Sequence, residues 1–261
     1  MNKPLQLIRP LPKTREQKTA LSVRNVSKIF PADDGYLNVL DKVNFDMTAG
    51  ELLCLLGPSG CGKSTLLKLI AGFMKPSAGN IRTQDRTVSR PGPDRCVVFQ
   101  EDALFPWLTV YENVAFGAKK LMQKKRLVSE VHCHLEMVGL TAFKDYLPKE
   151  ISGGMKQRVA LARVLILQPQ LLLMDEPFGA LDAQTREDMQ HLLLSLWEKF
   201  SHTIVFVTHD LVEAITLADR ILVMGTNPGR IQSEIPVTLP RPRKKESNAF
   251  HHFFRNLRNR L

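Results

Sequence analysis

The chain has 261 residues, of which 44% are hydrophobic and 24% are charged, the composition of an ordinary folded protein with one substantial domain. No apolar run approaches the ~20 residues of a membrane-spanning helix. Residues 1–18 contain no apolar stretch of the ~7–15 residues that a signal peptide needs. We therefore expect a cytoplasmic protein that does not itself cross a bilayer. The cysteines form no CxxC pair, which indicates a reduced protein.

The net charge of +10 resides at the two ends of the chain. Residues 1–18 carry five basic and one acidic residue, and residues 241–261 carry seven basic and one acidic residue, which leaves residues 19–240 neutral. A nucleic-acid-binding domain would carry a basic face on its folded body, so no nucleic-acid partner is expected. We interpret residues 1–20 as a flexible basic arm and residues 241–261 as a basic C-terminal tail. Both suit weak attraction to anionic lipids near a membrane partner, or a solubilising role.

The pattern of apolar residues predicts an α/β fold. The first segments, LSVRNVSKIF, VLDKVNFDM and ELLCLLG, alternate between apolar and polar residues and predict strands separated by turns. Fully apolar runs then alternate with helical patterns and predict parallel strands covered on both faces. These runs lie at 52–56, 96–99, 171–174, 203–207 and 221–224. Residues 101–155 lack strand runs and predict an inserted helical subdomain, and the prolines from Pro236 onward predict an irregular end.

A phosphate-binding loop is predicted between the run at 52–56 and the helical pattern after it. The sequence Gly57-x-x-x-x-Gly62-Lys63-Ser64 has the glycines, lysine and hydroxyl that such a loop needs, because backbone N–H groups and a helix N-terminus then face the phosphates. Lys63 is expected to reach the β- and γ-phosphates, and Ser64 to bind Mg²⁺. The full set of expected nucleotide contacts is Gly57, Pro58, Ser59, Gly60, Cys61, Gly62, Lys63, Ser64 and Thr65. The alternative is a glycine-rich turn with a solvated lysine.

Two carboxylates, Asp175 and Glu176, follow the apolar run LLLM at 171–174. Ligands of α/β proteins bind at such strand ends. Asp175 is expected to hold Mg²⁺ through water, and Glu176 to accept the proton of the attacking water. The alternative is a pair of helix-capping acids before Pro177.

Four further motifs resemble those of the ABC ATPases. ISGGMKQR at 151–158 resembles their signature motif, FGALD at 178–182 their D-loop and VTHD at 207–210 their switch segment with His209, while Gln100 in VVFQ matches their Q-loop. The motifs occur in the family's order, and the resemblance covers roughly residues 21–240. This sequence departs from the usual signature at Ile151 and Met155, and Met155 lacks the side-chain amide of the usual glutamine.

The resemblance implies a fold, two cofactors and a set of roles. The fold is an α/β P-loop NTPase (RecA-like) with a parallel-sheet core, an N-terminal antiparallel β subdomain and the inserted helical subdomain. The cofactors are ATP and Mg²⁺. The implied catalytic residues are Glu176, His209, Gln100 and Lys63, and the implied metal ligands are Ser64, Gln100 and Asp175. Adenine usually stacks on an aromatic residue upstream of the phosphate loop, for which Phe30 is the first choice and Tyr36 the alternative.

The same resemblance implies a head-to-tail homodimer or paired cassette. Each ATP is clamped between the phosphate loop of one chain and Ser152, Gly153 and Gly154 of the other. The N–H groups of these three residues, at a helix start, suit the γ-phosphate.

The run PGPDRCVVFQEDALFPWLTVYENVAFG at 91–117 looks like the nitrate/sulfonate/taurine importer group, as do SGGMKQR and the pair NPGRI and PRPR. This implies a peripheral ATPase at the cytoplasmic face of the inner membrane, bound to permease subunits and served by a periplasmic or extracellular substrate-binding protein. Phe105, Pro106 and Trp107 suit a groove for the permease, or ordinary packing. The alternatives are a soluble ABC ATPase acting on ribosomes or nucleic acid, an exporter ATPase and a non-catalytic regulatory cassette. The cargo remains open among sulfonates, taurine, nitrate, cyanate, bicarbonate and pyrimidine precursors.

Overall fold

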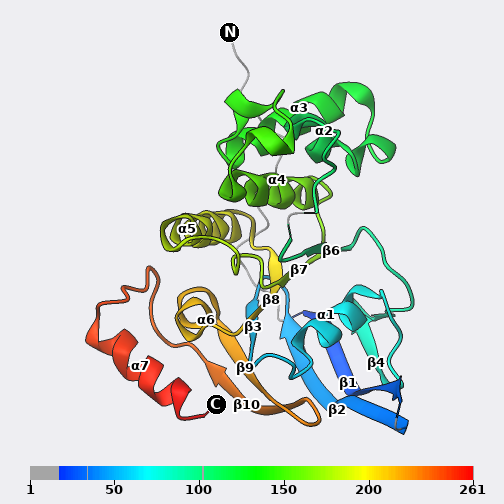
Figure 1. Cartoon of the computed structure of the whole chain (residues 1–261), viewed down its shortest axis with the longest axis vertical. Helices are drawn as coiled ribbons and strands as arrows, with labels where there is room; N and C mark the ends of the chain where they lie inside the picture. The colour runs from blue at the N-terminus through cyan, green and yellow to red at the C-terminus, as the bar shows by residue number, and fades with distance from the viewer. Residues whose placement is uncertain (1–17, 34, 102, 261) are drawn as a thin grey trace.

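The computed structural model describes residues 18–33, 35–101 and 103–260, so most of the expected N-terminal arm lies outside the described residues. Two sheets and a helical layer make up the fold (Figure 1). The strands are β1 (Thr19–Ala32), β2 (Gly35–Thr48), β3 (Leu52–Leu56), β4 (Ala78–Thr83), β5 (Arg86–Thr87), β6 (Arg95–Val98), β7 (Leu171–Asp175), β8 (Thr203–Thr208), β9 (Arg220–Gly225) and β10 (Arg230–Pro236). The α-helices are α1 (Lys63–Ala71), α2 (Val110–Ala115), α3 (Lys124–Met137), α4 (Gly153–Leu165), α5 (Ala183–Phe200), α6 (Leu211–Leu217) and α7 (Asn248–Arg258). Short 3₁₀ helices lie at Ala118–Lys120, Thr141–Phe143 and Pro148–Glu150.

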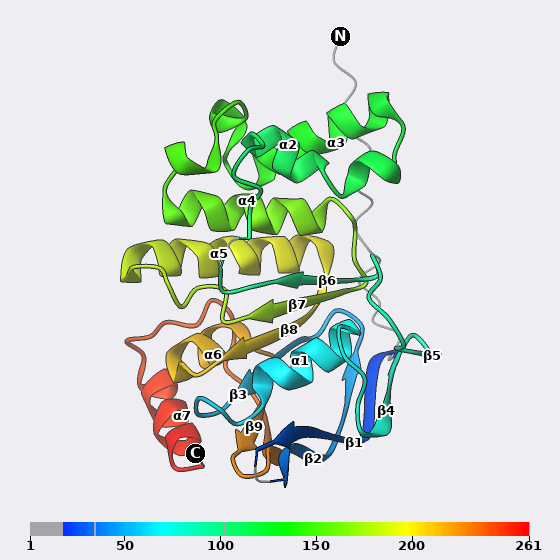
Figure 2. The same ribbon diagram turned by 45° about the vertical axis from the view of Figure 1, so that its right-hand side comes forward.

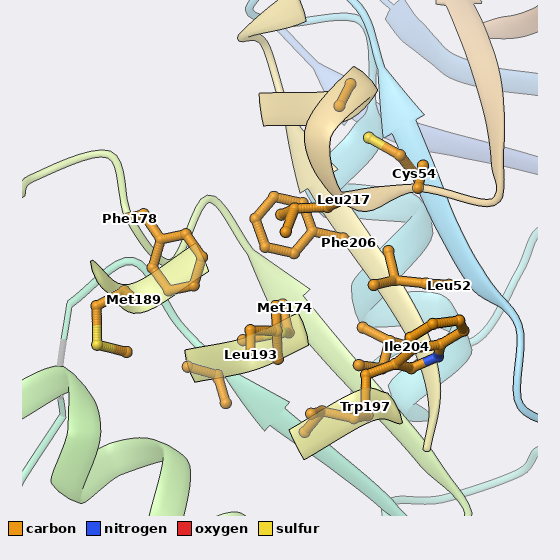
Figure 3. Close-up of a cluster of buried hydrophobic side chains, with 14 of the residues drawn as sticks. Leu52, Cys54, Met174, Phe178, Met189, Leu193, Trp197, Ile204, Phe206 and Leu217 are labelled. Carbon is orange, nitrogen blue, oxygen red and sulfur yellow. The ribbon is translucent and has the colours of Figure 1, made fainter. Parts of the chain in front are cut away.

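The central sheet has the order β10-β9-β3-β8-β7-β6, and its strands from β9 to β6 are parallel. Alternate residues of each parallel strand enter two different cores. In β3, Leu52, Cys54 and Leu56 pack on one face with residues of α4, α5 and α6, whereas Leu53 and Leu55 pack on the other with α1. Figure 3 shows the first of these cores around Trp197, Phe178 and Phe206. Burial on both faces explains why these strands are continuously apolar.

The second sheet has the order β2-β1-β4-β5 and is antiparallel. Its inward residues, such as Val23 and Phe45, share the core with α1 and with one face of the parallel sheet. Outward residues of the same strands are exposed, which gives the alternating pattern seen in the sequence. The expected α/β fold with an N-terminal antiparallel sheet is confirmed.

The helical region inserted between β6 and β7 has a core of its own, built from α2, α3, the first two 3₁₀ helices and α4 (Figure 1). Helix α2 begins with a capping box, in which Thr109 and Glu112 each accept from the other's backbone N–H. Val159 and Ala162 of α4 lie in this core, so the helical region continues through Leu165, past the expected boundary near residue 155. The reason is that α4 has two buried sides, one toward α3 and one toward α5.

The C-terminal segment differs from the expected irregular, basic tail. Residues 237–247 contain no helix or strand, but α7 follows, capped by Ser247, whose hydroxyl accepts from the Phe250 N–H at 3.2 Å. Phe250 and Leu257 of α7 are buried in the core beside α5 and α6. The last helix therefore begins only after the prolines, which do not prevent it from forming. Among the residues described, no helix combines the length and apolar character that crossing a membrane demands.

Candidate active site

The phosphate loop, residues 57–62, leaves the carboxyl end of β3 and leads directly into α1 (Figure 2). Gly57 is required by close packing, because a Cβ there would lie 2.6 Å from the Met224 carbonyl oxygen and 2.9 Å from the Cys61 sulfur. Gly62 has φ +95° and occupies the N-cap position of α1, where it brings no side chain to the free amides of the first turn. Those amides and the helix dipole suit an anion. Pro58, Ser59 and Gly60 are exposed, and Ser64 and Thr65 are half-buried in the first turn.

Lys63 lies beneath this loop and is only 5% exposed. Its ammonium donates to the carbonyl oxygens of Gly57, at 2.7 Å, and Pro58, at 2.9 Å. The Cys61 sulfur lies 3.8 Å away. Lys63 thus connects the end of the loop to its beginning through two neutral carbonyl acceptors. A phosphate bound in the loop would provide charged oxygen acceptors, which form stronger hydrogen bonds with an ammonium group.

Ser64 and Asp175 meet although they lie far apart in the sequence. The Ser64 hydroxyl donates to the Asp175 carboxylate at 2.8 Å, because α1 and the end of β7 lie side by side. Burial raises the pKa of Asp175, with the neighbouring Glu176 charge adding to the shift. A hydroxyl and a carboxylate at one strand end suit Mg²⁺, which takes few protein oxygens and completes its shell with phosphate and water. A divalent cation there would also relieve the crowding of the two carboxylates.

Glu176 and His209 form the second pair. The His209 Nδ1 atom lies 3.0 Å from the Glu176 carboxylate, and the histidine side chain is 57% exposed. The parallel pairing of β7 with β8 produces this contact, because Asp175 lies opposite Val207, so that Glu176 and His209 follow at the same end of the two neighbouring strands. Glu176 has φ +45°, an uncommon value for a residue with a side chain, and its N–H donates to the Val207 carbonyl at 3.0 Å.

Gln100 follows β6 and is held through its backbone. Gln157 of α4 donates to the Gln100 carbonyl at 3.0 Å. The side-chain amide of Gln100 lies beside Gly179: its nitrogen is 3.5 Å from the position that a Cβ added to Gly179 would take. The segment after β6 is therefore linked to α4 and lies next to residues 178–182.

The residues Ser152, Gly153 and Gly154 begin α4 and lie apart from the phosphate loop of the same chain (Figure 2). The Ser152 hydroxyl caps the helix by accepting from the Met155 N–H at 3.3 Å. Ser152 and Gly153 are exposed, whereas Gly154 is buried against Thr185 of α5, where a Cβ would collide with the Thr185 methyl group. The exposed helix start is open to an anion from outside the chain.

The two aromatic candidates for adenine stacking lie on the hairpin of β1 and β2. Phe30 is half-buried, with the Lys28 ammonium 4.9 Å from its ring centre, and Tyr36 is 84% exposed. Strand β2 of this hairpin passes close to the phosphate loop, because a Cβ added at Gly62 would lie 2.6 Å from the Leu40 side chain and 3.2 Å from the Val39 carbonyl oxygen.

Comparison with known proteins agrees with this geometry. Residues 40–179 match the family model described as ABC transporter. The bicarbonate transport ATP-binding protein CmpD of Synechococcus elongatus is 47% identical over 87% of this chain and 83% of its own length. The aliphatic sulfonates import ATP-binding protein SsuB of Bacillus cereus is 46% identical over 88% of this chain and 91% of its own.

Solved structures are similar as well. A dimeric ATP-binding cassette in a post-hydrolysis state, bound to ADP and Pi, is 31% identical, with a TM-score of 0.74 over 84% of this chain and all of that one. The chain belongs to the ABC transporter family. It is an ATPase of that family and binds ATP.

Two further residues, Arg186 and Asp210, shape the site of this ABC ATPase, although the sequence analysis assigned no role to either. Arg186 of α5 donates to the carbonyls of Phe178 and Leu181, at 3.3 and 2.8 Å, and so fixes the segment after Glu176. Asp210 caps α6 immediately after His209. The spacing Asp210-x-x-Glu213 is a recognisable helix-start signal, but the contacts of Arg186 have no signal in the sequence.

Substitution of Gly57 by alanine is expected to weaken ATP binding about tenfold or more. The added methyl group must push the loop away from the Met224 carbonyl, and overpacking of this kind costs about 1–3 kcal/mol, where 1.4 kcal/mol is tenfold in affinity. Titration with a fluorescent ATP analogue measures the effect. Thr87→Ala, at an exposed position outside the site, is the control for a general effect of substitution. Equal affinity in Gly57→Ala and the unsubstituted protein would show that the loop tolerates the shift.

Proposed function

We propose that this chain is the ATP-hydrolysing subunit of an ABC importer for a small anion, such as a sulfonate, taurine or nitrate. The observation that carries the ATPase part is the pair of hydrogen bonds Ser64–Asp175 and His209–Glu176 at the strand ends beside the phosphate loop. Relatives named for bicarbonate and sulfonate transport support the importer and the anionic cargo.

In the proposed reaction, the chain's own groups hold the triphosphate and receive one proton. The N–H groups of residues 57–65 bind the phosphates, and Lys63 turns from the Gly57 and Pro58 carbonyls toward their oxygens. Glu176 accepts the proton of the attacking water, while His209 orients the Glu176 carboxylate and contacts the γ-phosphate. Ser64, Asp175 and Gln100 would hold Mg²⁺, which would supply positive charge to the phosphate groups when bound. Phe30 stacks on adenine in this proposal, with Tyr36 as the alternative.

Two chains act together in the proposed complex. Ser152 and Gly153 are exposed at the start of α4 and lie apart from the phosphate loop of their own chain, so a second chain is needed to bring a helix start to each γ-phosphate. A related cassette was solved as a dimer, which supports the proposed pairing of two chains.

An exposed aromatic cluster supports a permease partner. Phe105 contacts both Trp107 and Phe116, with ring centres 5.7 and 4.3 Å apart, while Trp107 is 72% and Phe116 50% exposed. Exposed aromatic residues of this kind are typical anchors of protein interfaces. The cluster follows Gln100 closely in the chain, so the proposed partner binds near the catalytic site. The chain would then lie peripherally at the cytoplasmic face of the inner membrane, and a separate binding protein would select the cargo.

Purification of the tagged chain from detergent-solubilised native membranes is expected to bring down a multi-span permease in a two-to-two complex. The double variant Trp107→Ala, Phe116→Ala is expected to lose it, whereas Leu121→Ala, at an apolar residue 59% exposed in the same region, is expected to retain it. Recovery of ribosomal proteins, nucleic acid or no partner would contradict the importer and favour a soluble ABC ATPase.

A further inference from the structure

The side chain of Arg186, near the start of α5, closes a turn in the segment that follows Glu176. Its Nε and Nη2 atoms donate to the carbonyl oxygens of Phe178, at 3.3 Å, and Leu181, at 2.8 Å. The Leu181 N–H donates to the same Phe178 carbonyl at 3.2 Å, so a single guanidinium group holds both ends of the turn. Arginine suits this contact because its donors form a rigid planar fork, which the compact ammonium of a lysine does not reproduce.

The turn that Arg186 closes is joined directly to the backbone of Glu176. The Gly179 N–H donates to the Glu176 carbonyl at 3.1 Å, which closes a first turn before the one that Arg186 holds. Phe178, which belongs to both turns, anchors them with a side chain that is 1% exposed. Two successive turns therefore connect Glu176 to α5, and the arginine fixes the second of them.

The start of α4 packs on the same residues. A Cβ added at Gly154 would lie 2.3 Å from the methyl group of Thr185, so this glycine rests directly on the first turn of α5. A Cβ added at Gly153 would lie 3.9 Å from the side chain of Leu181, which is van der Waals distance. The start of α4 therefore contacts both the turn and the helix start that the Arg186 side chain joins.

We propose that Arg186 is a positioning residue for ATP hydrolysis, which holds Glu176 and the start of α4 in one fixed arrangement. The proposal rests on the two-chain complex proposed above. In that complex, Glu176 serves the nucleotide bound to its own chain, whereas residues 152–154 meet the γ-phosphate bound to the other chain. A displacement of the turn would move both groups, so each chain links the two nucleotide sites through Arg186.

This role predicts which properties change when the guanidinium fork is lost. The two carbonyls that Arg186 holds lie outside the phosphate loop, so binding of ATP to that loop is expected to remain. Turnover is expected to fall, because small displacements of a catalytic group lower the rate strongly. Association of two chains on ATP is expected to weaken as well, because the start of α4 loses its fixed support.

Steady-state ATPase kinetics and ATP titrations of the full-length protein provide the first test. Arg186→Lys, which keeps the charge but not the fork, is expected to lower kcat about tenfold and to change the Kd of a fluorescent ATP analogue less than about twofold. The matched control is Arg82→Lys, because Arg82 also donates to a backbone carbonyl, that of Asp85 at 2.7 Å, on an exposed strand outside the site. An unchanged kcat in Arg186→Lys, measured well below its Tm, would overturn the proposal and leave Arg186 a structural role only.

ATP-dependent association of two chains provides the second test. Glu176→Gln is expected to form a dimer in size-exclusion chromatography with light scattering, because it binds ATP and hydrolyses it slowly. At the same ATP concentration, the double variant Glu176→Gln, Arg186→Lys is expected to remain a monomer. A double variant that forms the dimer equally well would overturn the link to the start of α4. No ATP-dependent dimer in Glu176→Gln would instead contradict the two-chain complex, and the kcat comparison would still decide the role of Arg186.

A second substitution tests the same contact if Arg186→Lys does not fold. Thr185→Ser removes the methyl group on which Gly154 rests and retains the backbone N–H that donates to the Asp182 cap at 3.0 Å. It is expected to lower both kcat and dimer formation, with ATP affinity retained. Unchanged kcat and dimer formation in Thr185→Ser would overturn the proposal.

Discussion

The variant Glu176→Gln is expected to bind ATP as the unsubstituted chain does and to hydrolyse it ~10²-fold or more slowly. The amide has nearly the shape of the carboxylate and retains a hydrogen-bonding group 3.0 Å from His209 Nδ1, so the site should keep its form. It does not accept the proton of the attacking water, which is the step assigned to Glu176. Binding of a fluorescent ATP analogue and release of phosphate measure the two properties separately.

The matched control for this variant is Asp85→Asn. Asp85 is an exposed acid in the turn between β4 and β5, and asparagine tolerates its positive φ of 63°. Its phosphate release is expected to equal that of the unsubstituted protein. Near-normal turnover in Glu176→Gln would assign the proton acceptor to another group, with His209 the nearest candidate.

Truncation after Pro240 is expected to lower the free energy of unfolding by about 3–6 kcal/mol. The deletion removes the buried side chains of Phe250 and Leu257, each worth about 1.5–3 kcal/mol of burial, and exposes the part of the core that they cover. At about 2–4 °C per kcal/mol for a domain of this size, thermal unfolding should begin at least about 6 °C lower. Differential scanning calorimetry of the full and truncated chains measures the difference.

A point substitution on the same helix separates packing from charge. Leu257→Ala is expected to cost about 2–5 kcal/mol because it leaves a cavity, whereas Arg258→Ala, at the exposed neighbouring position, is expected to change the Tm little. An unchanged Tm in both the truncated chain and Leu257→Ala would show that α7 contributes nothing to the stability of the core.

Much of the fold and the site follows from local sequence. The loop at 57–62 needs glycines and a lysine at short fixed spacing, and continuous apolar runs such as 203–207 are distinctive of strands buried on both faces. The strand ends therefore locate the polar residues that follow them, Asp175 and Glu176 among them. These features are local, so they can be predicted from the sequence without knowing which strands pair with one another.

Contacts between distant segments depend on the tertiary structure. The Glu176–His209 pair needs the register of β7 against β8, and the Gln190–Glu213 pair needs the packing of α5 against α6. A sequence motif shows that such residues are polar, but it does not show which of them share a buried hydrogen bond.

The basic C-terminal segment shows most clearly the difference between what the sequence predicts and what depends on the tertiary structure. Its sequence has a high positive charge and follows several prolines, and these two features predict a basic, irregular tail over residues 241–261. In the folded chain, Arg243 donates to the carbonyls of Ile215, at 2.7 Å, and Ala218, at 2.6 Å, which the end of α6 leaves without helical partners. Arg241 pairs with Asp219 at 2.7 Å and lies over the Trp197 ring. These contacts depend on the tertiary structure, because the acceptor carbonyls belong to the end of α6 and not to the C-terminal segment. They can accept from the arginines only when residues 241–243 pack beside the end of α6.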